Sequence, residues 1–359
     1  MKIGIDASKF SVLQKTGTEY YTEEIIRRLI SDTHNNYILY SQKPLSLNLP
    51  SHCSNIVIPF PYLWTQVGLS LKMLTQPPDV LFIPAHVIPI IHPKNTVFTC
   101  HDLAFRRFPA FYSPFQRLYL EASVKQAVKR ASRIIAVSES TKKDLITFYG
   151  CPPEKIVVIY HGYNKQIYHT NIKAKRKIES PYILFVGRIE ERKNIRGLVT
   201  AFALLKKKSY SSLKLVLAGK QGYGYSQIKQ FIDERLSNVR HDIIELGYVD
   251  EKQLPSLYFH ASAFIFPSFY EGFGFPVIEA MASGCPVVCS DIAPLREIAD
   301  DAALFFNPHD PKEMAQKLQQ VIADQTLNRK MAAKGLKNAK RFSWEQCAKQ
   351  TNEVLEGKK

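Results

Sequence analysis

Short apolar segments rich in β-branched residues alternate with segments of helical periodicity along the whole chain. This alternation is typical of α/β domains, because each pair of neighbouring parallel strands needs a crossover helix. In the first half, the pattern predicts strands at residues 2–7, 37–40, 56–59, 80–83, 96–100, 133–137 and 155–159, and helices at 18–30, 64–74, 113–131 and 140–149.

A second series of the same kind follows a polar, basic stretch without periodicity at residues 169–180, which we interpret as an interdomain linker. The predicted strands are 182–186, 213–218, 243–249, 263–267 and 286–289, and the predicted helices are 193–206, 228–236, 253–260, 276–282 and 312–323. The expected organisation is therefore a first domain at 1–168, a second at 181–342 and a terminal segment at 343–359. Ser343-Trp344-Glu345-Gln346 matches a capping box and predicts a helix there.

The chain length of 359 residues suits two domains, since single cores rarely grow beyond roughly 250 to 300 residues. Two doubly wound domains would place the carboxyl ends of their strands at a shared cleft, where open α/β sheets bind ligands. An acidic residue near the N-terminus interrupts the segment where the apolar part of a signal sequence would have to lie. No apolar run is long enough to span a membrane. We therefore expect a cytoplasmic protein.

The formal net charge is +16, which attracts polyanions and leaves three interpretations open. The positive charge could bind an anionic membrane surface or an anionic acceptor. It could instead serve solubility alone, or it could bind a nucleic acid. We find no zinc knuckle, RNP-type strand or basic helix repeat, so no specific nucleic-acid partner is predicted. The six cysteines are scattered and fit neither a zinc spacing nor a disulfide framework, so we expect reduced thiols and no metal site.

The segment 271–279 places two carboxylates around two glycines and a proline that suits the start of a helix. Glu279 is predicted to lie in the first turn of that helix, and Glu271 in the loop before it. Glycines allow a ligand to approach the backbone closely, and the N–H groups at a helix start attract anions. Ionised glutamates would accept hydrogen bonds from sugar hydroxyls, so the pattern indicates a sugar diphosphate site. The alternative is a glycine-containing turn with two solvated glutamates.

Two cations follow the first strand of the second domain, where Arg188 and Lys193 flank its carboxyl end. An arginine fork and a lysine point charge could together neutralise a departing nucleoside diphosphate without a metal ion. We rank the neighbouring Arg192 below Lys193. The alternative is a solvated basic loop.

In the first domain, His101-Asp102 closes a predicted strand, so that a histidine oriented by Asp102 could bond a sugar hydroxyl. A structural His-Asp pair is the alternative. Gly17, in the loop that opens the first helix, could bring backbone N–H groups to a phosphate, with Thr16 or Thr18 as N-cap.

Two further stretches remain without a committed role. Residues 219–224 contain three glycines, but their spacing is reversed relative to a dinucleotide fingerprint, so we do not predict an NAD site. Residues 105–119 are basic and aromatic. They suit either a membrane interface or a loop and helix packed on the first domain, and the helical phase does not decide between these.

Taken together, these segments resemble retaining glycosyltransferases of family 4, and more closely the mannosyltransferase-like members. Glu271–Glu279 resembles the E-x7-E motif of this family, and the likeness continues through residues 280–288. Gly187-Arg188, Lys193-Asn194, residues 136–141, His101-Asp102 and Phe342-Ser343-Trp344 resemble the family in the same order. The likeness spans nearly the whole chain, although many members carry two or three glycines where this chain has Gly17 alone.

The resemblance implies a GT-B fold, with two Rossmann-like domains and a last helix that packs back on the first domain. Arg188 and Lys193 would bind the diphosphate, Glu279 the ribose, and His101 would face the transferred sugar. Glu271 and the Gly272-Phe273-Gly274-Phe275 backbone would bind that sugar. The resemblance implies a nucleotide-sugar as co-substrate, no other cofactor and no metal ion.

The implied reaction is retaining transfer of a hexose to a saccharide or lipid-linked acceptor for cell-surface polysaccharide or glycolipid synthesis. The Gly-Phe-Gly-Phe-Pro sequence favours GDP-mannose as donor, while glucosyl- and rhamnosyltransferases share similar motifs. Two alternatives stay open, a catalytically silent nucleotide-sugar or glycan-binding protein and a nucleotide-sugar epimerase. An enzyme of this kind could attach peripherally to the inner face of the cell membrane.

Overall fold

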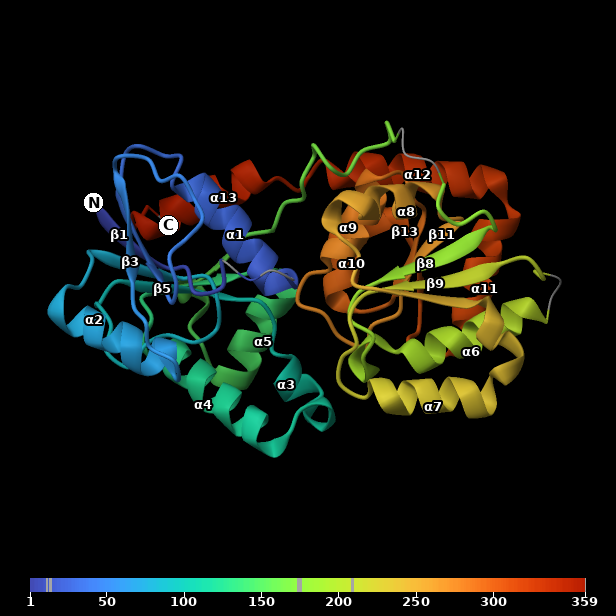
Figure 1. Cartoon of the computed structure of the whole chain (residues 1–359), viewed down its shortest axis with the longest axis horizontal. Coiled ribbons are helices and arrows are strands. Elements are labelled where there is room, and N and C mark those ends of the chain that lie inside the picture. The colour runs from blue at the N-terminus through green and yellow to red at the C-terminus, as the bar shows by residue number, and fades with distance from the viewer. Residues whose placement is uncertain (11, 13–14, 173–175, 208–209, 359) are drawn as a thin grey trace. The chain divides into compact units, whose positions relative to one another are not determined.

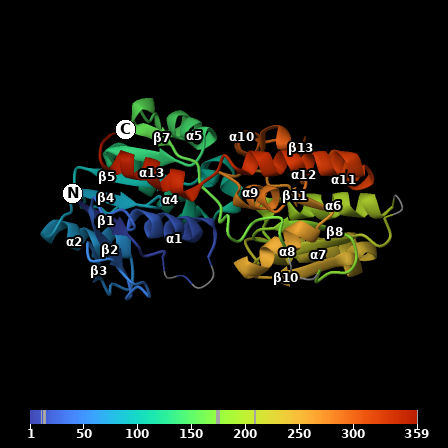
Figure 2. The ribbon, with the colours of Figure 1, turned by 90° about the horizontal axis from the view of Figure 1, so that it is seen from above.

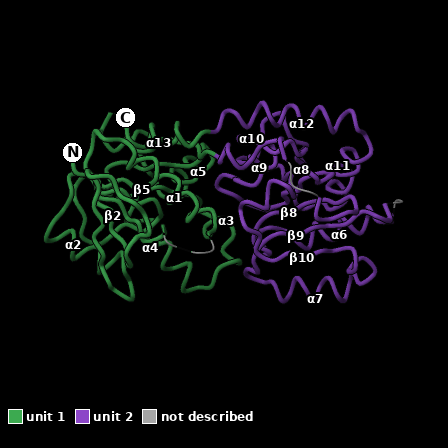
Figure 3. Tube along the Cα trace, turned by 45° about the horizontal axis from the view of Figure 1, so that its top comes forward, with its two compact units in different colours: residues 1–162, 343–359 green, residues 163–342 purple. Residues whose placement is uncertain are grey.

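The computed structural model describes residues 1–10, 12, 15–172, 176–207 and 210–358. The chain divides into two compact units, the first formed by Met1–Gly162 together with Ser343–Lys359 and the second by Tyr163–Phe342 (Figure 3). Each unit is a parallel sheet with helices packed against it (Figure 1).

The first unit is built on a seven-stranded parallel sheet in the order β3-β2-β1-β4-β5-β6-β7. Strands β4 and β5 are buried along their whole length, because helices cover both of their faces. The strands are β1 Lys2–Asp6, β2 Asn36–Ser41, β3 Cys53–Val57, β4 Val80–Ile83, β5 Thr96–Cys100, β6 Arg133–Ala136 and β7 Ile156–Val158.

The long helices α1, α4 and α5 of the first unit match the predicted ones, whereas the short α3 was not predicted and one predicted helix changes type. The predicted helix at 64–74 begins as a π-helix, η1, and becomes α-helical only at Ser70. The predicted strand at 56–59 lies earlier, at β3. The helical elements are α1 Gly17–Leu29, η1 Trp64–Leu69, α2 Ser70–Thr75, α3 Ala104–Arg107, η2 Pro109–Phe111, α4 Pro114–Arg130, α5 Glu139–Tyr149, η3 Pro153–Lys155 and α13 Trp344–Leu355.

The second unit repeats this architecture of a parallel sheet with helices packed against it (Figure 2). Its six strands follow the order β10-β9-β8-β11-β12-β13. The reversal of strand order beside β8 brings the carboxyl ends of β8 and β11 together. The strands are β8 Tyr182–Val186, β9 Lys214–Ala218, β10 Ile243–Gly247, β11 Ala263–Phe266, β12 Val287–Ser290 and β13 Ala303–Phe306.

The hydrophobic pattern did not predict two α-helices of this unit, α10 and α12, and strand β13 was also missed. A further difference concerns residue 193, which precedes the long helix in a separate 3-10 turn, η4. The helical elements are η4 Glu191–Lys193, α6 Ile195–Lys206, α7 Tyr225–Arg235, η5 Ser237–Asp242, η6 Glu251–Gln253, α8 Leu254–His260, α9 Phe275–Ala282, α10 Ala293–Ala299, η7 Asp300–Ala302, α11 Pro311–Ala323 and α12 Gln325–Ala339.

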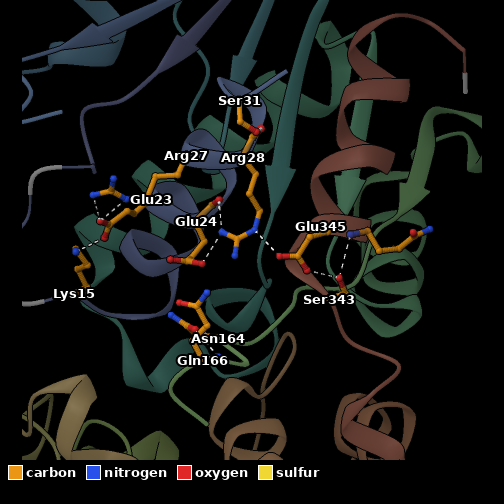
Figure 4. Close-up of polar contacts among 11 residues, drawn as sticks. Lys15, Glu23, Glu24, Arg27, Arg28, Ser31, Asn164, Gln166, Ser343 and Glu345 are labelled. Carbon is orange, nitrogen blue, oxygen red and sulfur yellow. Dashed lines mark hydrogen bonds and ion pairs between the residues drawn. The ribbon is translucent and has the colours of Figure 1, made fainter. Parts of the chain in front are cut away.

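Helix α13 belongs to the first unit although it follows the second in sequence. Ser343 is its N-cap and accepts a hydrogen bond from the Gln346 backbone N–H at 3.3 Å, as the capping pattern predicted. The buried Trp344 ring lies 6.1 Å from the ring of Tyr21 on α1. Arg28 of α1 lies between Glu24, at 2.7 Å, and Glu345 of α13, at 3.4 Å (Figure 4). Packing of aromatic side chains and an ion pair thus hold α13 on α1.

The boundary between the units lies after Gly162 rather than after residue 168. The reason is Tyr168, which is buried with its ring 6.2 Å from that of Tyr258 on α8, so this segment packs with the second unit. Residues 173–175 of the predicted linker lie outside the described residues.

Candidate active site

The candidate site of the second unit begins where β8 and β9 end in closely packed turns. Gly187 and Gly219 approach so closely that a Cβ on Gly219 would lie 1.8 Å from the Gly187 carbonyl oxygen. The backbone N–H of Ile189 donates to Lys220 O, and that of Gly222 donates to Ile189 O. The glycine stretch 219–224 therefore supports the turn that carries Arg188, which explains its glycines without a dinucleotide.

Lys193 and Glu271 form a buried ion pair at the carboxyl ends of β8 and β11. Lys193 Nζ donates to Glu271 Oε1 at 2.5 Å, and both residues are less than a tenth exposed. Burial lowers the pKa of Lys193, although the Glu271 carboxylate opposes this. Burial by itself would raise the pKa of Glu271, but the charges of Lys193 and Arg192 outweigh it, so that pKa lies below its usual value. Glu271 is therefore ionised at neutral pH.

Arg192 has a larger part in the site than its sequence position indicated. Its Nη1 donates to Tyr270 O at 2.9 Å and lies 3.6 Å from Glu271 Oε2, while its Nη2 donates to Glu190 Oε1 at 3.0 Å. The Phe269 N–H in turn donates to the Arg192 carbonyl at 3.0 Å. Arg192 thus ties the loop before Glu271 to the turn after β8. The signal that sequence reasoning could have used is its position beside Lys193 at a strand end.

Arg188 is the most accessible cation of this group. Its side chain is 52% exposed, and its Nε lies 3.4 Å from Glu190 Oε2. Arg188, Arg192 and Lys193 together contribute three positive charges against the two carboxylates of Glu190 and Glu271. One positive charge is left over, so the cluster favours the arrival of an anion, and Arg188 can turn to it by giving up a long, solvated ion pair.

The segment 272–275 is held by the packing of its two aromatic rings and by the glycine conformation at Gly274. The buried Phe273 ring packs edge-on against Phe275 and Phe342, with centroids 5.5 Å and 5.9 Å apart. Gly274 is the N-cap of α9 with φ +113°, and a Cβ there would lie 2.8 Å from a methyl carbon of Leu295. A side chain at this position would therefore be strained in backbone conformation and in packing.

Glu279 differs from the prediction in position and in charge. Helix α9 begins at Phe275, so Glu279 is its fifth residue and lies beyond the first turn. Its Oε2 accepts a hydrogen bond from Tyr258 Oη at 3.0 Å, and burial raises its pKa to about 8. The prediction that both glutamates are ionised is therefore wrong for Glu279, because burial without a neighbouring cation disfavours the carboxylate. Glu279 is mostly protonated at neutral pH.

His101 lies in the first unit, directly after β5, among other aromatic rings. Its ring is 5.5 Å from that of His86, 5.7 Å from that of His161 and 4.9 Å from that of Tyr21. Burial, and then the neighbouring His86, lower its pKa to about 4, so the ring is neutral at pH 7. Its Nε2 lies 3.0 Å from Pro84 O, and since a carbonyl only accepts, Nε2 carries the proton and Nδ1 is the acceptor. Asp102 Oδ1 accepts from the Ala104 N–H at 2.9 Å.

Gly17 is the first residue of α1 in the same unit. Thr16 is the N-cap and forms a capping box with Glu19, whose carboxylate accepts from the Thr16 backbone N–H at 3.0 Å. Of the two candidate caps, the structure therefore selects Thr16. Arg188, Lys193, Glu271, Glu279 and residues 272–275 all belong to the second unit, where Lys193 and Glu271 are in direct contact, whereas Gly17 and His101 belong to the first.

Comparison with known proteins finds two family models that together cover most of the chain. Residues 15–166 match Glycosyltransferase Family 4, and residues 169–338 match Glycosyl transferases group 1. The O-antigen chain mannosyltransferase B of Escherichia coli is 33% identical over 267 residues, which are 72% of this chain and 69% of that protein. This chain belongs to glycosyltransferase family 4.

Other relatives of this family 4 protein agree with the assignment. The O-antigen chain mannosyltransferase RfbU of Salmonella typhimurium is 33% identical over 228 residues, covering 63% of this chain and 60% of that protein. Sucrose-phosphate synthase of Thermosynechococcus elongatus superposes with a TM-score of 0.79 at 19% identity, covering 99% of this chain and 98% of that chain. At this identity the superposition shows the fold alone, and it confirms the predicted GT-B architecture.

The described residues of this glycosyltransferase contain neither a metal-binding cluster nor a membrane-spanning helix. Within the part of the chain that the structure describes, no three histidine, cysteine or acidic side chains are grouped so that they could hold a metal ion. Among the same residues, no helix is both long and apolar enough to cross a membrane.

Proposed function

We propose that this family 4 glycosyltransferase moves a mannosyl residue from GDP-mannose to a saccharide or lipid-linked acceptor in O-antigen-like polysaccharide synthesis. The proposal also holds that the anomeric configuration is retained and that no metal ion takes part. The observation that carries it is the buried Lys193–Glu271 pair within a cluster that has one positive charge in excess. The choice of mannose rests on the two O-antigen mannosyltransferases that the chain resembles.

The cation cluster suits the charge that develops on the leaving group. As the bond between the anomeric carbon and the diphosphate oxygen breaks, negative charge accumulates on GDP. Arg188 can leave Glu190 and grip the phosphates with its fork, while Lys193 is already held in place by Glu271 and by the Phe266 ring, 5.0 Å from its Nζ. A fixed lysine stabilises the transition state without reorganising at the moment of reaction.

The two glutamates would bind different parts of the donor, Glu271 the transferred sugar and Glu279 the nucleotide. Glu271 is ionised, so it can only accept hydrogen bonds, which suits the hydroxyls of the transferred sugar. Glu279 lies one turn into α9 beside Tyr258, where it would bind the ribose diol. The neutral His101 would offer its Nδ1 as an acceptor to a sugar hydroxyl.

Retention would follow from attack on the face that the diphosphate leaves. The acceptor oxygen forms its bond to the anomeric carbon while the bond to the diphosphate oxygen breaks. The acceptor hydroxyl gives its proton to that departing oxygen, so that GDP leaves with the proton on its diphosphate. No carboxylate has to attack the sugar in this course.

The test is a donor screen with the whole chain, in buffer containing EDTA. GDP-mannose, GDP-fucose, UDP-glucose and UDP-galactose would each be incubated with a mannose-terminated oligosaccharide. We expect GDP release and an extended product only with GDP-mannose, with an α-anomeric proton in the NMR spectrum of the product.

Each part of the proposal has its own contrary result. Product from a UDP-sugar alone would refute the donor, a β-linkage would refute retention, and loss of activity in EDTA would refute metal independence. Conversion of GDP-mannose to another nucleotide-sugar without acceptor would identify an epimerase instead.

A further inference from the structure

Two tyrosines contact the carboxyl group of Glu279 from different segments of the second unit. Tyr258 of α8 donates a hydrogen bond from Oη to Glu279 Oε2 at 3.0 Å. The hydroxyl group of Tyr168, in the segment with which the second unit begins, also bonds the Glu279 side chain. The two tyrosine rings pack edge-on against each other, with their centroids 6.2 Å apart. The tyrosines and the glutamate thus form one buried group.

The surroundings of the Tyr258 ring do not by themselves require a tyrosine. The side chain is fully buried, and its ring packs edge-on against Phe264 of β11, with centroids 5.3 Å apart. A phenylalanine would fill this apolar space equally well. A hydroxyl group taken from water into such a space costs free energy unless it is hydrogen-bonded. The bond to Glu279 therefore accounts for the hydroxyl group of Tyr258.

Tyr168 is held in place by its own segment. Its backbone N–H donates to Asn164 O at 2.9 Å, which closes a turn. Two residues further on, Thr170 approaches the end of α9 so closely that a Cβ on Gly284 would lie 3.0 Å from its Cγ2. This segment therefore lies against α9, the helix that carries Glu279, and the position of the Tyr168 ring is fixed on both sides.

The Tyr258 hydroxyl group acts as the donor in its bond to Glu279. Burial, and then the charge of Glu279, raise the pKa of Tyr258 well above its usual value, so this hydroxyl group keeps its proton. The groups that face Glu279 are Tyr258, Tyr168 and the acidic side chain of Glu251 in η6. Burial raises the pKa of Glu279, the hydrogen bonds from both tyrosines lower it, and the charge of Glu251 raises it. The tyrosines thus hold this carboxyl group by hydrogen bonds rather than by opposite charge.

The carboxyl group that the tyrosines hold is still accessible. Glu279 is 7% exposed, whereas Tyr258 is completely enclosed. Hydrogen bonds from two fixed rings restrict rotation of the carboxyl group and so set the direction of its accessible edge. A side chain that is already ordered in the free protein loses little rotamer freedom when a ligand arrives, which favours binding.

We propose that Tyr258 and Tyr168 are positioning residues that orient Glu279 for the ribose diol of the nucleotide. The inference rests on the role of Glu279 in the proposed function, and it adds two residues that do not have to touch the nucleotide themselves. Each tyrosine acts through the carboxyl group of Glu279. A purely structural pair would stabilise the fold and would have no specific effect on the ribose.

The experiment is a double-mutant cycle on nucleotide affinity, measured by isothermal titration of the whole chain with GDP and with UDP. Tyr258→Phe and Tyr168→Phe each remove a hydroxyl group and keep the ring. Each should raise the dissociation constant about fivefold, the typical effect of one hydrogen bond. In the Glu279→Ala background the same changes should alter it by less than about twofold, because the group through which they act is absent.

Tyr182→Phe is the matched control. Tyr182 is buried in the same unit and donates from Oη to Leu257 O of α8 at 2.7 Å, so this variant also loses a tyrosine hydrogen bond at that helix. It should lower the Tm about as much as Tyr258→Phe does and leave nucleotide affinity unchanged. In turnover, Tyr258→Phe should raise KM for the nucleotide-sugar about fivefold with kcat unchanged.

A second measurement needs no change at Glu279. The unaltered chain should bind GDP more tightly than 2′-deoxy-GDP, and Tyr258→Phe should reduce this preference. An unchanged preference would refute the positioning role even if Glu279→Ala does not fold.

The remaining contrary results separate this inference from the proposed function. Native affinity in both tyrosine variants, combined with weak binding in Glu279→Ala, would refute the positioning role alone. An equal loss of affinity with and without Glu279 would show that the tyrosines do not act through it. Native affinity in Glu279→Ala would overturn the ribose assignment itself. A chain that binds only UDP would refute the proposed donor, and the cycle measured with UDP would still decide the positioning role, because UDP carries the same ribose.

Discussion

Replacement of Glu279 by glutamine tests the charge state that the structure assigns to this residue. Glu279 is buried beside Tyr258, and burial raises its pKa from the usual 4.5 to about 8. Glutamine has nearly the same shape, can still accept the hydrogen bond from Tyr258 and does not titrate. The variant therefore removes the ionisation and keeps the packing.

The magnitude follows from the linkage between proton binding and folding. A carboxyl whose pKa is higher in the folded state stabilises the fold below the unfolded pKa, and this stability is lost as the pH rises through the folded value. With pKa values of 4.5 unfolded and about 8 folded, the loss between pH 5 and pH 8 is about 3.5 kcal/mol. Glu279→Gln should not show this loss, so it should gain stability relative to the native chain by that amount.

The assay is urea unfolding of both proteins at several pH values, followed by far-UV circular dichroism. Only the difference between the two curves is interpreted, because it cancels the titration of other groups. The titration of His101, for example, has the opposite effect. Because the pKa of His101 is lowered in the folded protein, the stability that it contributes is lost as the pH falls through about 4. Both tryptophans, Trp64 and Trp344, lie in the first unit, so their fluorescence reports that unit separately.

A difference between native and variant protein that stays constant from pH 5 to pH 8 would refute the reasoning. Glu279 would then be ionised throughout, and the hydrogen bond from Tyr258 would have to compensate for burial. Below pH 5, a difference that falls as the pH rises would show that a cation stabilises the carboxylate, which the described contacts of Glu279 do not contain.

Three further predictions concern the cation cluster and the two glutamates. Arg188→Gln should lower kcat by about 100-fold while leaving the Tm nearly unchanged, since Arg188 is half exposed and acts on the leaving group. Lys193→Met should lower kcat similarly and also destabilise the fold by about 3 kcal/mol in urea unfolding, because Glu271 loses a buried partner. In isothermal titration with GDP, Glu279→Ala should weaken binding at least tenfold, whereas Glu271→Ala should leave it within about twofold.

Each of these predictions has a definite contrary outcome. Full turnover in Arg188→Gln would show that Arg188 does not bind the diphosphate. If Lys193→Met and the double variant Lys193→Met with Glu271→Gln were equally unstable, the pair would not be coupled in the folded protein. Equal loss of GDP binding in both glutamate variants would contradict the division of ribose and sugar between them.

Much of the fold could be predicted because the relevant signals are local. Strands such as 182–186 and 80–83 are continuous apolar runs, and helices begin at identifiable caps such as Ser343. Elements with weaker signals were missed. Strand β13, Ala-Leu-Phe-Phe, contains no β-branched residue and is only partly buried, and η1 has a π-helical hydrogen-bond pattern that amphipathic periodicity does not reveal.

Several candidate site residues could be proposed from the sequence, since their position at strand ends places them at one edge of a sheet. The role of Arg192 was missed because Arg192 and Lys193 have the same charge at adjacent positions. Only their contacts distinguish them. Lys193 is bonded to Glu271, and Arg192 bonds the backbone of the loop before it.

By itself, the amino-acid sequence determined the two α/β units, the family motifs and the cations that follow β8, because these depend on residue type and on spacing over a few turns. The tertiary structure alone decided the pairing of Lys193 with Glu271, which are 78 positions apart in the chain. It also decided that Glu271 is charged and that Glu279 is mostly protonated, although both are buried glutamates of one motif. The physical reason is that a pKa depends on which charges and how much water surround a group, and these are set by residues brought close only by folding.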